Sequence, residues 1–102
     1  MSGYVYEYLY QGYLDAPESR THVFRTTADR KIWFEMQVAV EEDGIEAWQR
    51  SQGRILNTAE RYAVAKLALF EAFDERATPE AMRERVRVPG SRIAAFLESL
   101  EI

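Results

Sequence analysis

The sequence predicts an α+β domain in which an antiparallel sheet of three or four strands, formed mainly by residues 4–40, packs on C-terminal helices. Residues 31–40 alternate apolar and polar side chains, a pattern with the period of a strand. Residues 57–75 instead repeat apolar side chains with the period of a helix. Because the strand-like segments come before the helical ones, the order favours an α+β class.

The composition is that of a soluble globular chain, with 102 residues, 47% hydrophobic and 29% charged. This length predicts a single domain over residues 1–102. The sequence has no cysteine, which excludes disulfides and fits a reducing compartment. No apolar run approaches the roughly 18 residues of a membrane span, and the N-terminus does not resemble a signal peptide. We therefore expect a cytoplasmic protein without a membrane partner.

The first predicted strand covers residues 4–14, where aromatic and β-branched residues dominate. Its alternation places Val5, Glu7, Leu9 and Gln11 on one face. The opposite face receives four tyrosines: Tyr4, Tyr6, Tyr8 and Tyr10. Gly12 predicts a bulge, which would reset the alternation near Tyr13.

Residues 20–27 and 31–40 are predicted to form a hairpin that turns at residues 28–30. The face of the third strand that we expect the helices to cover carries Ile32, Phe34, Met36, Val38 and Val40. Trp33 and Glu35 lie on its other face. Residues 41–44 predict an acidic turn. Residues 45–54 allow a short irregular helix or a fourth edge strand, and the pattern favours the helix.

The helix predicted at residues 57–75 begins with Asn57 as its N-cap and Glu60 in the position of a capping box. Lys66 projects into the apolar arc of this helix. It could have a lowered pKa and serve as a base or an anion anchor. The favoured alternative is a side-chain stem on apolar surface, or an ion pair with Glu7 or Glu35.

Two further helices are predicted at residues 79–87 and 91–100. Thr78 followed by Pro79 is a typical helix start, and Pro89-Gly90 ends that helix. Ser91 is positioned to cap the last helix.

Residues 78–100 resemble the helix-turn-helix pattern of transcription regulators. Met82 and Val86 would be apolar positions of the first helix, and Val88 would fill the turn. Arg83 departs from the pattern, which has a small residue there, and Arg87 stands where glycine is usual. The resemblance implies DNA binding, with phosphate contacts from four arginines: Arg83, Arg85, Arg87 and Arg92. The net charge of −4 disfavours nucleic acid.

Catalytic motifs are not found. His22 is the only histidine, and the five glycines match no phosphate-binding loop. We therefore predict no catalytic residue, no cofactor and no metal, and we expect a protein that is not an enzyme.

The tyrosine-rich strand carries the leading functional hypothesis. If its tyrosine face looks outward, the rings form a surface together with Trp33. Such a surface suits a protein partner or a homodimer, because interfaces are rich in tyrosine and tryptophan. It would also suit single-stranded nucleic acid, and half-buried tyrosines without a specific role are a third alternative. We predict an interaction module with the interface Tyr4, Tyr6, Tyr8, Tyr10 and Trp33, and a DNA-binding regulator as its alternative.

Overall fold

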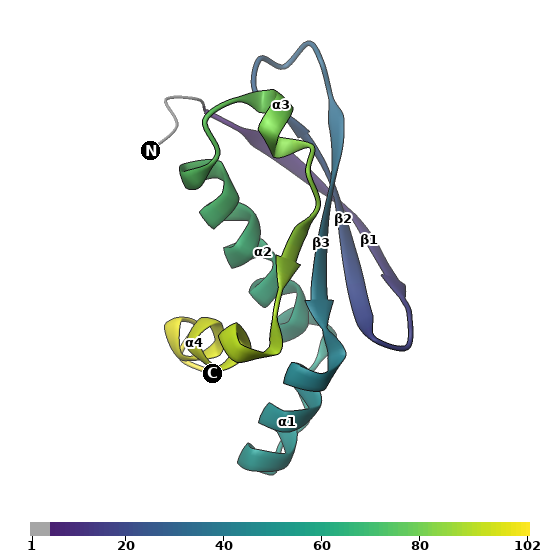
Figure 1. Ribbon diagram of the computed structural model, residues 1–102, viewed down its shortest axis with the longest axis vertical. Helices are drawn as coiled ribbons and strands as arrows, with labels where there is room; N and C mark the ends of the chain where they lie inside the picture. Colours follow the sequence, from purple (N-terminus) through teal and green to yellow (C-terminus); the bar gives the residue numbers. More distant parts are fainter. Residues whose placement is uncertain (1–4) are drawn as a thin grey trace.

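A computed structural model of the protein describes residues 5–102 (Figure 1). The elements in chain order are β1 (Glu7–Asp15), β2 (Ser19–Thr27), β3 (Phe34–Glu41), α1 (Glu42–Gln52), α2 (Thr58–Glu75), α3 (Pro79–Met82), β4 (Val86–Val88) and α4 (Gly90–Ser99). The strands form one sheet in the order β1-β2-β3-β4. The first three are antiparallel neighbours, whereas β4 runs parallel to β3. The predicted α+β class is confirmed, with a mixed sheet.

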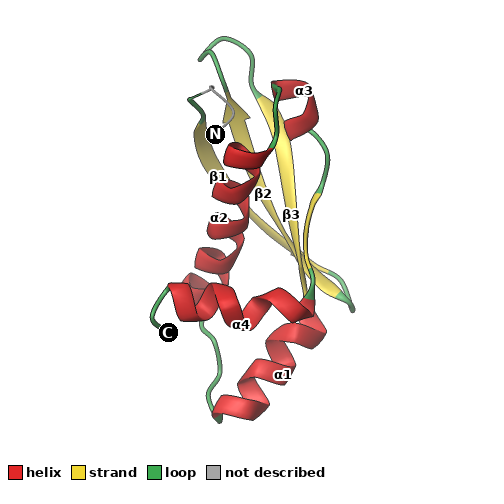
Figure 2. Ribbon diagram, turned by 60° about the vertical axis from the view of Figure 1, so that its left-hand side comes forward, coloured by secondary structure: helices red, strands yellow, loops and turns green. Residues whose placement is uncertain are grey.

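The long helix α2 crosses one face of the sheet, while α1 and α4 lie at one end of the molecule (Figure 2). We call the face under α2 the inner face and the opposite one the outer face. The inner face carries Phe24, Met36 and Val38, which are fully buried. From α2 they meet Val64, Ala65 and Leu69, also fully buried. The core thus lies between the sheet and α2, and it extends to α1 and α4 through Ile45 and Leu97.

The hairpin of β1 and β2 contains the bulge that Gly12 predicts. Tyr10 pairs with Phe24, but after a register shift Gly12 pairs with Val23 and Tyr13 with His22. Gly12 has φ +117°, a backbone conformation that residues other than glycine rarely adopt. The bulge therefore resets the alternation, as predicted, and places Tyr13 on the same face of the sheet as Tyr10.

The predicted hairpin of β2 and β3 is confirmed, but β3 begins at Phe34 rather than at residue 31. The carboxylate of Asp29 accepts hydrogen bonds from the backbone N–H groups of Lys31 and Ile32, both at 2.9 Å. These bonds hold the segment before Phe34 in a loop. Ile32 is 61% exposed there, so its predicted place on the helix-covered face is wrong.

The helix predicted in residues 45–54 is confirmed as α1, but it starts three residues earlier, directly after β3. The predicted acidic turn at residues 41–44 is wrong. Glu42 and Asp43 stand in the first helical turn, where negative charge is favourable beside free N–H groups. Gly53, with φ +64°, ends the helix.

Helices α1 and α4 approach each other closely at two glycines. A Cβ atom added to Gly44 would lie 2.5 Å from the Cα atom of Gly90. Only glycine at position 44 permits this crossing. It fixes α4, and with it the preceding strand β4, at the end of β3.

Helix α2 agrees with its prediction. The Asn57 side chain accepts from the Glu60 N–H at 2.8 Å, and the Glu60 carboxylate accepts from the Asn57 N–H at 3.0 Å. This reciprocal pair is the predicted capping box.

The helix predicted at residues 79–87 ends at Met82, and residues 86–88 form β4 instead. Arg76 donates to the carbonyls of Ala81, Met82 and Glu84 at 2.9, 3.1 and 2.6 Å, which satisfies groups that a longer helix would have bonded. Val88 pairs with Val40 in β3 and is 1% exposed. The last helix is confirmed as α4, but its N-cap is Pro89 without a side-chain hydrogen bond, so the predicted cap at Ser91 is wrong.

Candidate functional site

Strand β1 forms one edge of the sheet. It pairs with β2 along one side only, over nine residues from Glu7 to Asp15. The backbone groups on its other side have no strand beside them within residues 5–102. A long edge of this kind can hydrogen-bond to another chain.

The tyrosines of β1, and Tyr6 just before it, lie on the inner face, against α2. The Tyr6 ring stacks on Phe73 at 4.7 Å between centroids, Tyr8 meets Phe70 at 5.5 Å, and Tyr10 meets Tyr62 at 4.5 Å. The expectation that these rings look outward is therefore wrong. Tyr4 lies outside the described residues.

Trp33 is separated from the tyrosines. It precedes β3, and the guanidinium of Arg25 lies over its ring, 5.9 Å from the centroid. Arg25 is paired with Leu9 on one side and Glu35 on the other, which is the outer row of side chains. The four predicted interface residues that lie within residues 5–102 thus do not form one surface.

The outer face of β1 carries exposed apolar side chains instead. Leu9 is 56% exposed and Leu14 is 69% exposed. Val5, just before the strand, is 84% exposed. The alternation of the first strand places Val5 and Leu9 together on one face, and in the structure both side chains are exposed.

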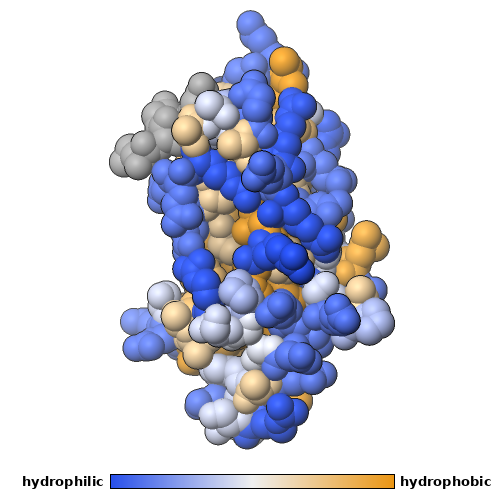
Figure 3. Space-filling model, viewed as in Figure 1, coloured by the Kyte–Doolittle hydropathy of each residue, from blue (hydrophilic) through white to orange (hydrophobic). Residues whose placement is uncertain are grey.

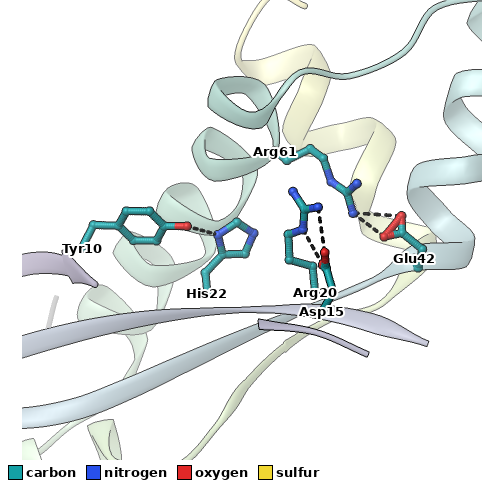
Figure 4. A network of polar contacts seen from close by, with 6 residues as sticks. All are labelled: Tyr10, Asp15, Arg20, His22, Glu42 and Arg61. Atoms are coloured by element: carbon teal, nitrogen blue, oxygen red, sulfur yellow. Dashed lines mark hydrogen bonds and ion pairs between the residues drawn. The ribbon is translucent and has the colours of Figure 1, made fainter. Parts of the chain in front are cut away.

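A polar cluster lies at the inner face where β1, β2, α1 and α2 meet (Figure 4). Asp15 and Arg20 form a bidentate pair at 2.7 and 3.1 Å, and the Arg20 guanidinium lies 3.8 Å from the ring centre of Tyr13. The bond from Arg20 lowers the pKa of Asp15. Arg61 of α2 forms an ion pair with Glu42 of α1. Charge-assisted bonds in this cluster thus join β1 to β2 and α1 to α2.

His22 stands in this cluster, 1% exposed, with its Nδ1 atom 2.9 Å from the Tyr10 hydroxyl. Burial, and secondly Arg20, lower the pKa of His22 from 6.5 to about 4. Its Nε2 atom has no hydrogen-bond partner among residues 5–102. The imidazole is therefore neutral at pH 7, and it lacks the titration near neutral pH that general acid–base catalysis uses. Burial also raises the pKa of Tyr10.

The four predicted phosphate contacts are dispersed. Arg92 makes a bidentate ion pair with Glu71 at 2.6 and 2.8 Å, and Arg83 lies over the Phe34 ring at 5.3 Å. Arg85 donates to Thr21 at 2.7 Å. Arg85 and Arg87 line one cavity, and Arg87 lines a second one with Arg92, so no single cavity gathers all four arginines. Strand β4 separates α3 from α4, where the helix-turn-helix pattern has a tight turn.

Lys66 is half-buried on α2. Its Nζ atom lies 6.0 Å from the centre of the Tyr62 ring and 5.7 Å from that of Phe70, at the range of cation–π contacts. Glu7 pairs with Arg30 at 3.0 Å, and Glu35 accepts from Gln37. The aromatic contacts agree with the alternative of a stem on apolar surface. A functional role for Lys66 stays a prediction.

Within residues 5–102, no three histidine, aspartate or glutamate side chains come together to hold a metal ion. No helix in that range combines the length and apolar character needed to cross a membrane.

Comparison with protein-family models, with curated proteins and with solved structures gave no match to this chain. The geometry of the chain singles out the open edge of β1 as the candidate site.

Proposed function

We propose that the protein is a small, non-enzymatic, cytoplasmic interaction module that self-associates by antiparallel pairing of β1 with β1 of a second copy. The two sheets would join into one. The observation that carries this proposal is the edge strand of nine residues, open on one side and bearing exposed leucines. The lack of cysteine supports a reducing compartment.

The backbone of β1 supplies the main attraction. Natural edge strands are kept from pairing by lysine, proline, short length or a bulge. Residues 7–11 contain neither lysine nor proline, and the bulge follows them at Gly12. This regular segment is therefore the part of the edge that can accept another strand.

The sequence of the segment favours one register. A two-fold axis at Leu9 puts Leu9 against its own copy, Glu7 against Gln11, and Tyr8 against Tyr10. No like charges face each other in this arrangement. An axis at Gln11 would set Glu7 against Asp15, and two opposed carboxylates destabilise a strand pair.

The outer face adds an apolar contact to this register. Leu9 of each copy is 56% exposed in the free chain and would be covered by the other copy. Burial of the exposed parts of two leucines contributes on the order of 1–3 kcal/mol. Arg30, which pairs with Glu7 at 3.0 Å, lowers the local negative charge at each end of the contact.

The test is sedimentation velocity over a range of concentrations, with Leu9→Lys and Leu14→Lys beside the wild type. Two lysines would meet at the axis in Leu9→Lys, so we expect a monomer. Leu14→Lys makes the same change of charge on the same face, beyond the bulge, and should remain a dimer. A wild type that stays monomeric at high concentration, or equal effects of both variants, would contradict the proposal.

DNA binding through Arg83, Arg85, Arg87 and Arg92 remains a prediction without a supporting observation. It differs from the proposal in its dependence on salt, because phosphate contacts release counterions and backbone pairing does not. Fluorescence anisotropy with duplex DNA at low and moderate salt separates the two.

A further inference from the structure

A cavity of about 460 Å³ opens where the turn between β1 and β2, the end of β3 and the start of β4 come together. Its lining includes Pro17 and Glu18 of the turn, Ala39 and Glu41 of β3, and the side chains of Arg85 and Arg87. Both arginines are exposed, whereas Ala39 is only 7% exposed and forms the floor. The site lies apart from residues 7–11, the segment proposed to pair.

Strand alternation explains why two arginines meet here. Val88 of β4 is buried and faces the core, so its neighbour Arg87 faces the opposite way, as does Arg85. In the parallel register Arg87 pairs with Ala39. The small side chain of Ala39 leaves the space between the arginines and the turn unfilled.

The guanidinium groups of Arg85 and Arg87 have N–H donors that make no hydrogen bond. Arg85 donates through Nη2 to the hydroxyl of Thr21 at 2.7 Å, and Thr21 is 8% exposed, so this bond fixes the position of Arg85. The other N–H groups of Arg85 are not used in this bond. The side chain of Arg87 makes no hydrogen bond or ion pair within residues 5–102. Five donors of a guanidinium are thus available on Arg87.

Two carboxylates border the same cavity. Glu41 accepts from the backbone N–H of Gly90 at 2.7 Å, which ties it to the start of α4. Glu18 comes from the turn, and its side chain makes no bond within the described range. Glu18 would repel a simple anion but would attract a cationic group on a ligand that also carries an anionic one.

We propose that this cavity binds the carboxylate or phosphate group of a small soluble ligand between Arg85 and Arg87. The planar donors of arginine match the oxygens of both groups, with two parallel hydrogen bonds from one guanidinium. Ala39 and Pro17 provide an apolar wall for the body of the ligand. Arg83 and Arg92 have no part in this site.

The test is a titration followed by the amide resonances of isotopically labelled protein, with inorganic phosphate and with acetate, at constant ionic strength. We expect saturable shifts at the amides of Ala39 and Arg87 for at least one anion. Arg87→Gln should weaken binding by about tenfold or more, since hydrogen bonds to charged groups are strong. Arg50→Gln, an exposed arginine of α1, is the matched control and should bind as the wild type does.

Further variants identify the ligand group and keep the test independent of dimerisation. Saturation by phosphate alone or by acetate alone tells which group the cavity prefers. Glu18→Gln should tighten the binding of either anion, because it removes the opposing charge. Leu9→Lys should leave binding intact even if it changes the oligomeric state. Shifts that never saturate, or equal affinities of Arg87→Gln and Arg50→Gln, would overturn the proposal.

Discussion

The two edges of the sheet differ in length and in what surrounds them. Strand β1 has nine residues, with exposed leucines on its outer face and a free side along its length. Strand β4 has three residues, is flanked by Arg85 and Pro89, and leads directly into α4. Short length, proline and charge are the features that keep an edge from pairing.

The surroundings of β4 add to this protection. Between α2 and β4 lies a small cavity of about 190 Å³, lined by Ala72, Val86 and the ion pair of Glu71 with Arg92. Apolar atoms show at this hollow among charged side chains in Figure 3. One edge of the sheet is therefore covered by helices and arginines, whereas the edge at β1 is open.

The largest expected effect is on the closed edge. Leu97 of α4 is fully buried in the core. Leu97→Ala should lower the free energy of unfolding by about 2–5 kcal/mol, because it leaves a cavity. In Leu97→Ala, the amides of β4 should lose more hydrogen-exchange protection than the amides of β2. Urea unfolding measures the free energy of unfolding. The control for helix propensity is Ala94→Gly, on the exposed side of α4, which is expected to cost about 1 kcal/mol.

A medium effect is expected at the inner side of β1, where Tyr10 meets His22. The folded chain holds the pKa of His22 at about 4, below its ordinary 6.5. Below pH 6.5 the unfolded chain therefore binds the proton more readily, and stability falls until about pH 4. Between pH 7.5 and pH 5 the loss should be about 2 kcal/mol.

Urea unfolding at these two pH values measures that loss. His22→Gln should be less stable than the wild type at pH 7.5, and its stability should depend less on pH in this interval. Parallel pH profiles of the two proteins would show that His22 is not the group responsible.

The smallest effect is expected at the start of α2, whose Tyr62 lies 4.5 Å from the Tyr10 ring of β1. Asn57→Ala removes the N-cap and should cost about 1 kcal/mol. Ser91→Ala is the matched control in α4, where no side chain caps the helix, and should be nearly neutral. Thermal unfolding of both variants measures the difference. Equal losses would mean that the Asn57 cap contributes nothing specific.

The sequence predicts the local features of this fold well. The capping box of Asn57 and Glu60 and the bulge at Gly12 depend on neighbouring residues only, and both are present. The sequence predicts a helix over residues 79–87, longer than α3, because residues 83–87 contain no strong helix breaker. Residues 86–88 become a strand through parallel pairing with β3, a contact across 48 positions from Val38 to Val86 that no local pattern reveals.

The candidate site was predicted in part. Alternation separates the tyrosines of β1 from Val5 and Leu9, but the same alternation fits either face being buried. The rings have more apolar area to bury than leucine and valine, and α2 offers Tyr62, Phe70 and Phe73 as partners. Those partners lie more than fifty positions away in the chain, so the correct face follows only from the tertiary structure.

The most direct test of the open edge is amide hydrogen exchange of the wild type at low and high protein concentration, resolved for single residues. Self-pairing at β1 predicts that alternate amides within residues 7–11 become protected as the concentration rises, while the amides of β4 do not change. Exchange at residues 7–11 that is the same at every concentration would contradict the account.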